Sequence, residues 1–374
     1  MEQANILVVG GGIGGLATAI ALRQVGFDVH VVERYPDLHS SVFGVGIIQP
    51  ANALRALDMI GCYQRCLEVG FQAKVWGSAY DIDGNFLADI PGGEIEGYPP
   101  MNGVTRPALH EILTTRALGL GVTIQYDSAF ESLVQTDDGV DVTLSDGRTL
   151  HADVVVGADG VGSRVRKHVL AGDLKPLYTG QSAYRVNIPR DGIDRIMLQP
   201  GPKGMAGFVP IGKELAYFFY NALVERDQRP SDDQLAETLR GHLAPFGGRT
   251  AKVREEYLDN PDSIVLRPEE TLIASAPWHQ GRVVLIGDSV HAITPHLGQG
   301  AAQAIEDGIV LAECLAKHPD LEGAFAEYVE RRFERCKLVV ETSLNIGKWE
   351  TGQLEGFDNV AATDHALRVL AEPL

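Results

Sequence analysis

The start of the chain combines continuous apolar runs with helical spacing. Ile6 to Val9 form a short β-branched run, which is typical of a parallel strand buried on both faces. Between residues 16 and 25, apolar side chains recur at the spacing of a helix face, namely at Leu16, Ala19 and Ile20. A second apolar run covers Val29 to Val32. The pattern therefore predicts a strand–helix–strand unit.

The middle of the chain follows a different period. Between residues 122 and 151, apolar and polar positions alternate, and the turn signals TDDG (136–139) and SDG (145–147) separate the runs. This pattern predicts a small antiparallel meander. Continuous apolar runs return at residues 152–156 and 282–286, so we expect two further buried strands there.

Helices are marked by caps and by apolar stripes. Thr105 precedes a helix that has Pro107 in its first turn, and Ser231 is placed to cap a helix over residues 231–243. A last long helix over residues 321–344 carries one apolar stripe, formed by Phe325, Val329 and Phe333. The tail beyond residue 351 is only weakly specified.

The turn after the first predicted strand is the first candidate for chemistry. Gly10, Gly12 and Gly15 form G-x-G-x-x-G, which permits a tight turn, close approach of backbone to a pyrophosphate and close helix–strand packing. The helix that follows directs its free amides and positive dipole end at phosphate. Glu33 ends the second strand, where a carboxylate accepts from ribose hydroxyls and favours FAD or NAD over NADP. If the glycine-rich turn bound no ligand, the position of the acid Glu33 at the end of the second strand would be unexplained. The unit therefore predicts a dinucleotide site.

Two more predicted strands end in acids and glycines. Residues 157–166 (GADGVGSRVR) contain Asp159, and residues 287–301 (GDSVHAITPHLGQGA) contain Asp288. Ligands of open α/β sheets bind at the carboxyl ends of strands, so both segments are expected at the site. A helix opens near Gly300 and Ala301, and its N-terminal dipole favours negative charge.

These elements predict an α/β fold with a Rossmann-like nucleotide-binding domain, built from a parallel sheet, a β-meander and helices. We expect this domain to be discontinuous, over residues 1–75, 104–175 and 271–318. The turn-rich segments 76–103 and 176–270 read as an inserted mixed β-sheet domain, and residues 319–374 as a C-terminal helix and tail. A turn flanked by Gly44 and Gly46 precedes a helix over residues 51–57.

Composition excludes several classes of partner. The 374 residues include 32 Lys and Arg against 50 Asp and Glu, giving a net charge of −18, so we expect neither nucleic acid nor an anionic membrane as partner. The four cysteines form no C-x-x-C pair, which favours reduced thiols and no metal site. The apolar start lacks a basic region and is explained by the glycine motif, so we expect a cytoplasmic protein, monomeric or homodimeric.

Taken together, GGGIGG ending in Glu33, GADGVGSRVR and GDSVHAITPHLGQGAAQAIEDG resemble the single-component FAD-dependent aromatic hydroxylases, the flavoprotein monooxygenase family that includes salicylate hydroxylase and 6-hydroxynicotinate 3-monooxygenase. TRPALHEIL around Arg106 fits the same family, and the likeness spans nearly the whole chain. The resemblance implies that the discontinuous domain binds FAD, with Glu33 on the adenosine ribose and Arg34 beside it. It implies a full set of FAD-binding residues at Gly10, Gly12, Ile13, Gly14, Gly15, Glu33, Arg34, Gly46, Ile47, Arg106, Asp159, Asp288, Pro295, Gly298, Gln299, Gly300 and Ala301.

The resemblance also implies the reaction. NAD(P)H would reduce FAD, O₂ would form a flavin C4a-hydroperoxide, and this would hydroxylate a small aromatic or N-heteroaromatic substrate in a dry pocket under the inserted domain. Where relatives carry a polar base, this chain has Phe208, so no base is assigned. His296 and Pro295 beside the ring, and Tyr217, are the catalytic candidates, although a lone His or Tyr is more often structural. Two interpretations of Arg185 are open: its side chain faces the flavin or the substrate, or it is an ordinary ion-pair partner.

Alternatives remain at this stage. A reductase or dehydrogenase of the same fold without oxygen insertion shares every FAD motif. A flavin halogenase would be expected to show W-x-W-x-I-P, and a disulfide reductase a second glycine motif with a cysteine pair; the sequence has neither. A dehydrogenase that uses NAD alone would be colourless. The substrate and the choice between NADH and NADPH stay open.

Overall fold

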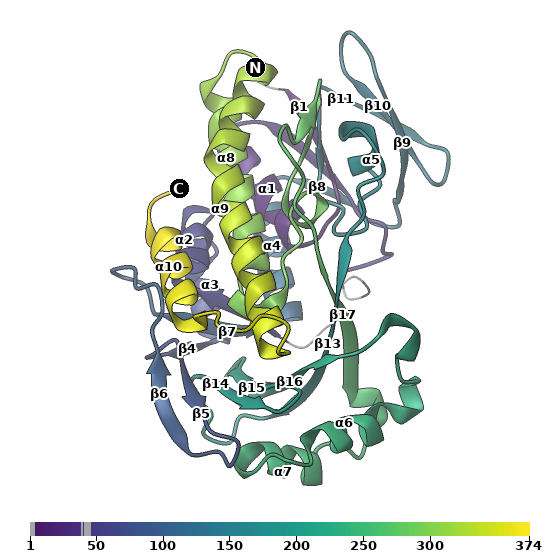
Figure 1. Cartoon of the computed structure of the whole chain (residues 1–374). Helices are drawn as coiled ribbons and strands as arrows, with labels where there is room; N and C mark the ends of the chain where they lie inside the picture. Colours follow the sequence, from purple (N-terminus) through teal and green to yellow (C-terminus); the bar gives the residue numbers. More distant parts are fainter. Residues whose placement is uncertain (1–3, 39, 41–45) are drawn as a thin grey trace.

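The apolar runs at the start of the chain lie at the centre of a six-stranded sheet, ordered β18-β19-β12-β1-β2-β8 (Figure 1). The computed structural model describes residues 4–38, 40 and 46–374, so Gly44 lies outside the described residues. The strands of this sheet are β1 (Asn5–Val9), β2 (Asp28–Val32), β8 (Thr123–Gln125), β12 (Val154–Gly157), β18 (His279–Gln280) and β19 (Val283–Leu285). Every neighbouring pair is parallel except β18 and β19. Ile6, Leu7 and Val8 are at most 1% exposed, as expected for a strand covered on both faces.

Helices pack on the six-stranded sheet and on one another. They are α1 (Ile13–Gln24), α2 (Ala51–Met59), α3 (Tyr63–Val69), α4 (Arg106–Gly119), α5 (Arg166–Val169), α8 (Gly300–Lys317), α9 (Leu321–Glu350) and α10 (Asn359–Ala371). Helices α1 and α8 pack closely because Gly308 has no side chain; a Cβ there would lie 2.4 Å from the Thr18 hydroxyl. Thr105 caps α4 as predicted, with its hydroxyl accepting from the Ala108 amide at 3.3 Å.

The alternating segment forms the predicted meander. It consists of β9 (Phe130–Gln135), β10 (Val140–Leu144) and β11 (Thr149–Ala152), paired antiparallel. Val140 and Val142 of the central strand are fully buried while the residues between them are half-buried, which matches the period of two.

A second sheet has seven strands, ordered β17-β13-β16-β15-β14-β5-β6. Its strands are β5 (Gly77–Tyr80), β6 (Phe86–Ile90), β13 (Leu177–Pro189), β14 (Ile196–Gly201), β15 (Gly204–Pro210), β16 (Leu215–Leu223) and β17 (Ile264–Thr271). One face packs against α6 (Leu235–Leu243) and α7 (Gly248–Glu256). The other face meets a small three-stranded sheet of β3 (Gly46–Pro50), β7 (Met101–Thr105) and β4 (Phe71–Ala73). Figure 1 shows the two large sheets in separate lobes, with α9 running from the upper lobe down to the lower one.

The α/β architecture matches the prediction, but several details differ. The helix predicted over residues 231–243 is a 3₁₀ turn, η2 (Asp232–Gln234), capped by Ser231 and followed by α6. Helix α9 continues six residues beyond its predicted end, to Glu350. The tail folds into α10, whose last carbonyls accept hydrogen bonds from Arg55 and Arg335. Helix α7, which begins at Gly248 with Gly247 as its N-cap, was not predicted from the sequence.

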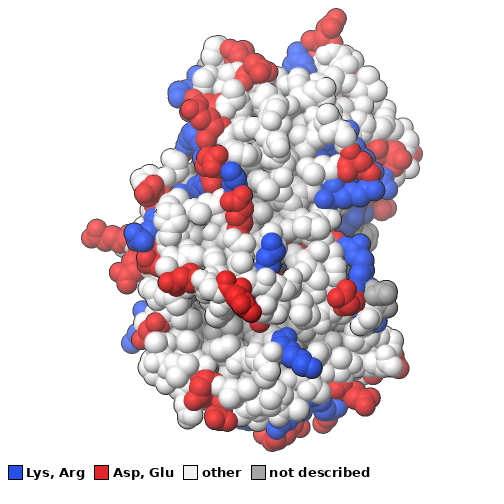
Figure 2. All heavy atoms as spheres, viewed as in Figure 1, with Lys and Arg blue, Asp and Glu red and all other residues white. Residues whose placement is uncertain are grey.

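The surface carries charges of both signs. On the face drawn in Figure 2, basic and acidic side chains are interspersed and no broad basic patch stands out. Among the described residues, no helix has the length and apolar composition needed to cross a bilayer.

Candidate functional site

The predicted motifs meet at one edge of the six-stranded sheet. Val9 pairs in register with Val32 on one side and with Gly157 on the other, and Gly157 pairs with Leu285. Because these strands are parallel, the segments that follow them all emerge at the same edge. The glycine motif, Glu33, the loop with Asp159 and the turn with Asp288 are thereby brought together.

The three glycines of the motif meet different surroundings. Gly10 has φ +111°, and a Cβ there would lie 2.4 Å from the carbonyl oxygen of Ala158. A Cβ on Gly15 would lie 1.9 Å from the carbonyl oxygen of Gly10, so this glycine allows α1 to pack on β1. A Cβ on Gly12, at the N-cap of α1, would meet nothing within 4 Å. Space is therefore left in front of the helix N-terminus, whose first amides have no partner within the helix.

Two buried side chains fix the glycine loop from opposite sides. Glu33 accepts from the amide of Gly11 at 2.7 Å and from the amide of Tyr35 at 3.0 Å. His110 of α4 lies 2.7 Å from the carbonyl oxygen of Gly11 through its Nε2. A carboxylate has about four acceptor positions, so Glu33 keeps acceptor capacity for a further hydroxyl. Arg34 is exposed and stacks over the ring of Tyr35 at 4.8 Å.

Asp159 and Asp288 occupy neighbouring strand ends but differ in their contacts. The carboxylate of Asp159 accepts from the Ser163 hydroxyl and from the amides of Arg164 at 2.7 Å and Val165 at 3.1 Å, so it organises its own loop. Asp288 lies in a short 3₁₀ turn, η4 (Gly287–Ser289), and makes no hydrogen bond through its carboxylate with any described residue. Its oxygens are thus available to a ligand.

Asp288 and Arg106 lie close enough for their charges to interact, and we call the space beside them the recess. Both side chains are accessible to solvent. Burial nevertheless raises the pKa of Asp288 and lowers the pKa of Arg106, and each charge moderates the shift of the other. Both groups are thus accessible to solvent, while their ionised forms are partly desolvated. Pro295, which opens a second 3₁₀ turn, η5 (Pro295–Leu297), is also exposed.

The turn after Pro295 leads into α8. Gly298 has φ +64°, a conformation that favours glycine, and packs beside Ile48. Gly300 begins the helix, and a Cβ there would meet nothing within 4 Å; Ala301 follows it and is half-buried. The amide of Gln299, by contrast, is fully buried and exchanges hydrogen bonds with Asn52 at 3.0 and 3.1 Å, so its side chain holds α8 to α2.

Aromatic and aliphatic side chains of the seven-stranded sheet face this recess. Tyr217 and Phe219 of β16 belong to an apolar cluster that includes Ile48 of β3. Gly46 begins β3 against them, since a Cβ there would lie 2.9 Å from the Tyr217 ring. Phe208 packs in the other core, with its ring 5.2 Å from that of Phe218. The expectation that Phe208 replaces a pocket base is therefore wrong, because its side chain points to the α6 side of the sheet.

The remaining motif residues support the packing of α1 and β3. Ile13, the first residue of α1, and Ile47 of β3 are both buried in the main core. A Cβ on Gly14 would lie 3.0 Å from the Cβ of Ala304, so this glycine allows α1 to approach α8.

His296 lies behind Pro295 and is fully enclosed. Its Nδ1 lies 3.0 Å from the Thr294 hydroxyl, and its Nε2 forms ion pairs with Glu350 at 3.4 Å and Glu269 at 3.6 Å. Burial by itself would lower the pKa of His296, but the carboxylates of Glu350 and Glu269 raise it to about 9. The ring is thus a buried cation that joins β17, α9 and the η5 turn, while Pro295 is exposed.

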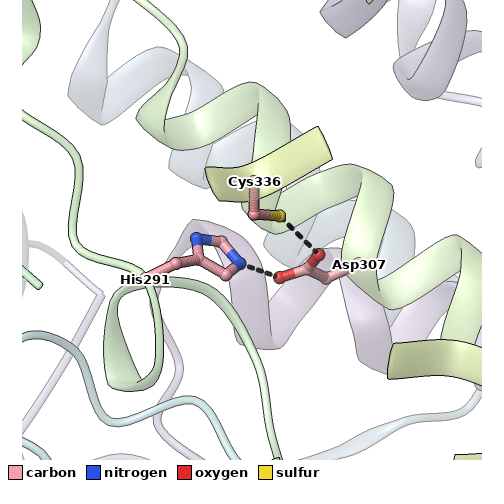
Figure 3. Close-up of side chains that lie close together, drawn as sticks. All are labelled: His291, Asp307 and Cys336. Carbon is pink, nitrogen blue, oxygen red and sulfur yellow. Dashed lines mark hydrogen bonds and ion pairs between the residues drawn. The ribbon is translucent and has the colours of Figure 1, made fainter. Parts of the chain in front are cut away.

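A second buried network fixes the Asp288 turn from behind. Asp307 of α8 accepts from the Gly287 amide at 2.8 Å, from His291 at 2.6 Å and from Arg332 of α9 at 2.7 Å. Figure 3 shows His291, Asp307 and Cys336 converging, with the Cys336 thiol 3.9 Å from Asp307. His291 and Arg332 keep the pKa of Asp307 far below its usual range although burial opposes this. Because the Asp307 oxygens already accept from three N–H donors, His291, Arg332 and the Gly287 amide, this cluster is held together as an ion-pair network.

Sequence reasoning missed several of these residues. His110, Glu269 and Arg332 lie in helices and a strand without a local motif, and their roles depend on contacts across the fold. One signal could have indicated them: these polar or charged residues fall at positions that the helical or strand pattern assigns to the interior.

The residues at this edge fit a dinucleotide such as FAD. The open space at Gly12 lies before a helix N-terminus, Glu33 retains acceptors, and Asp288 and Arg106 are accessible to solvent. The glycine loop suits a pyrophosphate, Glu33 a ribose, and Asp288 with Arg106 a polyhydroxyl chain.

Comparison with known families and proteins agrees with this geometry. The family model of the FAD binding domain matches residues 3–343. The chain is 32% identical over 346 residues to the putative FAD-dependent monooxygenase YetM of Bacillus subtilis (strain 168), covering 91% of this chain and 92% of that protein. It is 31% identical over 357 residues to 6-hydroxynicotinate 3-monooxygenase of Pseudomonas fluorescens, covering 91% of both.

Solved structures give the same result for the fold. A tetrameric form of 2-methyl-3-hydroxypyridine-5-carboxylic acid oxygenase superposes with a TM-score of 0.81 at 25% identity, covering 98% of this chain and 97% of that one. HpxO of Klebsiella pneumoniae, in complex with FAD and uric acid, superposes with a TM-score of 0.82 at 22% identity, covering 99% and 93%.

Proposed function

Because this chain belongs to the FAD binding domain family, we propose that it is an FAD-dependent monooxygenase that uses NAD(P)H and O₂ to hydroxylate a small aromatic or N-heteroaromatic molecule. The observation that carries the proposal is the position of Arg106 and Asp288 at the dinucleotide edge, close to Tyr217 and the apolar wall of the seven-stranded sheet. An enzyme that only bound the dinucleotide would not need this second, apolar wall.

Several residues of this chain are proposed to hold FAD. The glycine loop and the amides of α1 would take the pyrophosphate, and Glu33 the adenosine ribose. Asp288 would accept from hydroxyls of the ribityl chain, and Arg106 would donate to its oxygens. When bound, FAD supplies the electron exchange with NAD(P)H and the activation of O₂.

The chain's own contribution is orientation, charge and exclusion of water. The N-terminus of α8 at Gly300 offers free amides and a positive dipole end to negative charge that develops beside it. Tyr217, Phe219 and Ile48 form an apolar wall that keeps water from the reacting centre. Hydroxylation of an electron-rich ring requires the stabilisation of negative charge and the exclusion of water at the same site.

We further propose a division of labour between the two large sheets. Residues 1–75, 104–175 and 271–318 would form the FAD-binding domain, and residues 76–103 and 176–270 the substrate domain, with 319–374 as the C-terminal helix and tail. Support comes from the separation of strands, since β5, β6 and β13–β17 share one sheet while β1, β2, β12 and β19 share another.

The experiment that tests the proposal is a turnover screen of the FAD-saturated protein. A panel of phenols, hydroxypyridines and quinolones is added with NADH or NADPH, and cofactor consumption and products are measured. We expect at least one compound to stimulate consumption and to gain a hydroxyl group. Stimulated consumption that yields only reduced substrate would instead favour a reductase of the same fold. The absence of any stimulation across the panel would contradict the proposed hydroxylation.

A further inference from the structure

His110 and Glu33 bind the two backbone groups of Gly11, the middle residue of the glycine run 10–12. The Gly11 amide donates to the Glu33 carboxylate at 2.7 Å. The Gly11 carbonyl oxygen lies 2.7 Å from Nε2 of His110, which is on the second turn of α4. A carbonyl oxygen only accepts, so Nε2 carries a proton and donates to it. Within the described residues, no other group donates to this oxygen.

The surroundings of His110 favour a neutral ring that donates one hydrogen bond. The residue is buried, and burial lowers the pKa of His110 although the bond to Gly11 opposes this shift. The charges of Glu33 and Arg106 act on it in opposite directions. A neutral imidazole has a single N–H, which here is on Nε2. Nδ1 is buried and has no hydrogen-bond partner among the described residues, so no second contact competes for the proton.

The peptide between Gly11 and Gly12 connects this hydrogen bond to the space in front of α1. The peptide is trans, so its carbonyl and its N–H point in opposite directions. The Gly12 amide therefore points away from His110. Gly12 is exposed, and within the described part of the chain its amide has no acceptor. The amide is thus available to an anion that lies before the helix N-terminus.

This orientation needs a contact that holds it. A peptide between two glycines turns over readily, because no Cβ restricts the neighbouring dihedral angles. Turned over, it would present the Gly11 carbonyl oxygen instead of the Gly12 amide to the space before α1, and the oxygen would repel a phosphate. Glu33 does not prevent this, since the Gly11 amide belongs to the preceding peptide. The bond from His110 to the Gly11 carbonyl does prevent it.

We propose that His110 is a positioning residue for the cofactor, which holds the Gly11–Gly12 peptide in the orientation that presents the Gly12 amide to the pyrophosphate of FAD. The inference rests on the proposed placement of the pyrophosphate at the glycine loop, and it is independent of the reaction that the flavin performs. Arg106 precedes His110 by four residues and so lies on the same face of α4. Helix α4 would then contact FAD through Arg106 and shape the pyrophosphate loop through His110.

The test compares four variants with wild type. His110→Leu removes the donor, His110→Asn keeps a polar side chain that is too short to reach Gly11, and His110→Gln places an amide nitrogen close to the position of Nε2. His279→Leu is the matched control, because His279 is also buried with an unpartnered Nδ1 but lies on β18, at the outer edge of the same sheet. Fluorescence titration of the flavin-free proteins gives the dissociation constant of FAD, and thermal unfolding gives their stability.

We expect His110→Leu and His110→Asn to bind FAD about 10- to 150-fold more weakly, the range for one hydrogen bond to a charged group. His110→Gln and His279→Leu should bind FAD nearly as wild type does. At saturating FAD, ³¹P NMR reports directly on the bound pyrophosphate. Its signals should shift in His110→Leu and His110→Asn and keep their wild-type positions in the other two variants. A purely structural role would lower the stability of the flavin-free protein without shifting these signals.

Three results would overturn the proposal: unchanged FAD affinity in His110→Leu, equal weakening in His110→Gln and His110→Asn, or weaker binding with unshifted ³¹P signals. If His110→Leu does not fold, the comparison of His110→Asn with His110→Gln decides in the same way. Retention of FAD by Gly12→Val would contradict the placement of the pyrophosphate and this inference with it. Loss of FAD in Gly12→Val together with unchanged affinity in His110→Leu would contradict the role of His110 alone.

Discussion

Asp159 and Asp288 follow neighbouring parallel strands, yet their carboxylates serve different partners. Asp159 accepts from the amides of its own loop, whereas Asp288 has free oxygens at the recess. The position of an acid at a strand end is therefore insufficient to assign a ligand contact; its remaining acceptor capacity decides.

Replacing Asp288 with Ala tests this distinction. A charge-assisted hydrogen bond contributes about 1.5–3 kcal/mol, so we expect FAD to bind about 10- to 150-fold more weakly to Asp288→Ala. Fluorescence titration of the protein freed of flavin measures the dissociation constant. Asp138→Ala, at an exposed turn, serves as control and should bind FAD as wild type does. Equal affinity of Asp288→Ala and wild type would remove Asp288 from the site.

The glycines of the first motif allow a second residue-level prediction. Gly12→Val places methyl groups in open space, so the flavin-free protein should keep its stability to within about 1 kcal/mol while FAD retention is lost. Gly15→Val puts a side chain on a carbonyl oxygen and should prevent folding. Thermal unfolding and flavin content of the two variants are compared. Normal flavin content in Gly12→Val would contradict the assignment of the pyrophosphate to this loop.

His296 leads to a prediction about pH. Its pKa in the folded protein is about 9 against an ordinary value of 6.5, so its ion pairs with Glu269 and Glu350 stabilise the fold fully below pH 6.5 and lose this effect as pH rises through 9. The free energy of unfolding of wild type, relative to His296→Gln, should fall by on the order of 3 kcal/mol over that interval. Urea unfolding at a series of pH values gives both curves. Parallel curves would show that His296 is not a buried cation.

The sequence predicted which residues lie at the edge of the sheet better than it predicted which partners their side chains contact. The spacing of Gly10, Gly12 and Gly15 has a local meaning, because turn geometry and close approach depend on the absent side chain. His296 and Gln299 lie in an equally recognisable segment, but their surroundings come from β17, α9 and α2, which are distant in the chain. No local pattern could indicate that Gln299 packs on Asn52.

At the scale of elements, helix α9 connects the parts of the site. Arg332 and Arg335 reach from α9 to Glu306 of α8, and Arg335 also binds the last carbonyls of α10. The apolar stripe predicted this helix, but not the ion pairs that attach it to α8, since charged residues on a helix usually face solvent. Asp307, which accepts from Arg332, also accepts from the Gly287 amide and so holds the three-residue turn η4 in place.

Removing Arg332 should therefore be far more harmful than removing its neighbour. Arg332→Met removes one of the two cations that pair with each of the buried carboxylates Glu306 and Asp307, and we expect a loss of about 3 kcal/mol in the free energy of unfolding. Arg331→Met removes only surface pairs with Glu313 and Glu327, which contribute at most about 1 kcal/mol. Chemical unfolding measures both values. Similar losses in the two variants would show that the network does not stabilise the turn.

At the scale of the whole molecule, the two lobes present complementary surfaces to one recess. The six-stranded sheet contributes strand ends with glycines and carboxylates, and the seven-stranded sheet contributes aromatic side chains. The discontinuous order of segments along the chain predicted two units, because turn-rich stretches interrupt the nucleotide-binding pattern. Which face of the second sheet meets the first was beyond sequence reasoning, since both faces of β13, β15 and β16 carry large apolar residues.

The central claim is that this recess inserts oxygen into an aromatic ring, and isotope labelling tests it most directly. A compound that stimulates NAD(P)H consumption is converted under ¹⁸O-labelled O₂, and the product is analysed by mass spectrometry. The account predicts one labelled oxygen atom in each product molecule and no conversion when O₂ is removed. Conversion in the absence of O₂, or a product that carries oxygen from water instead, would contradict it.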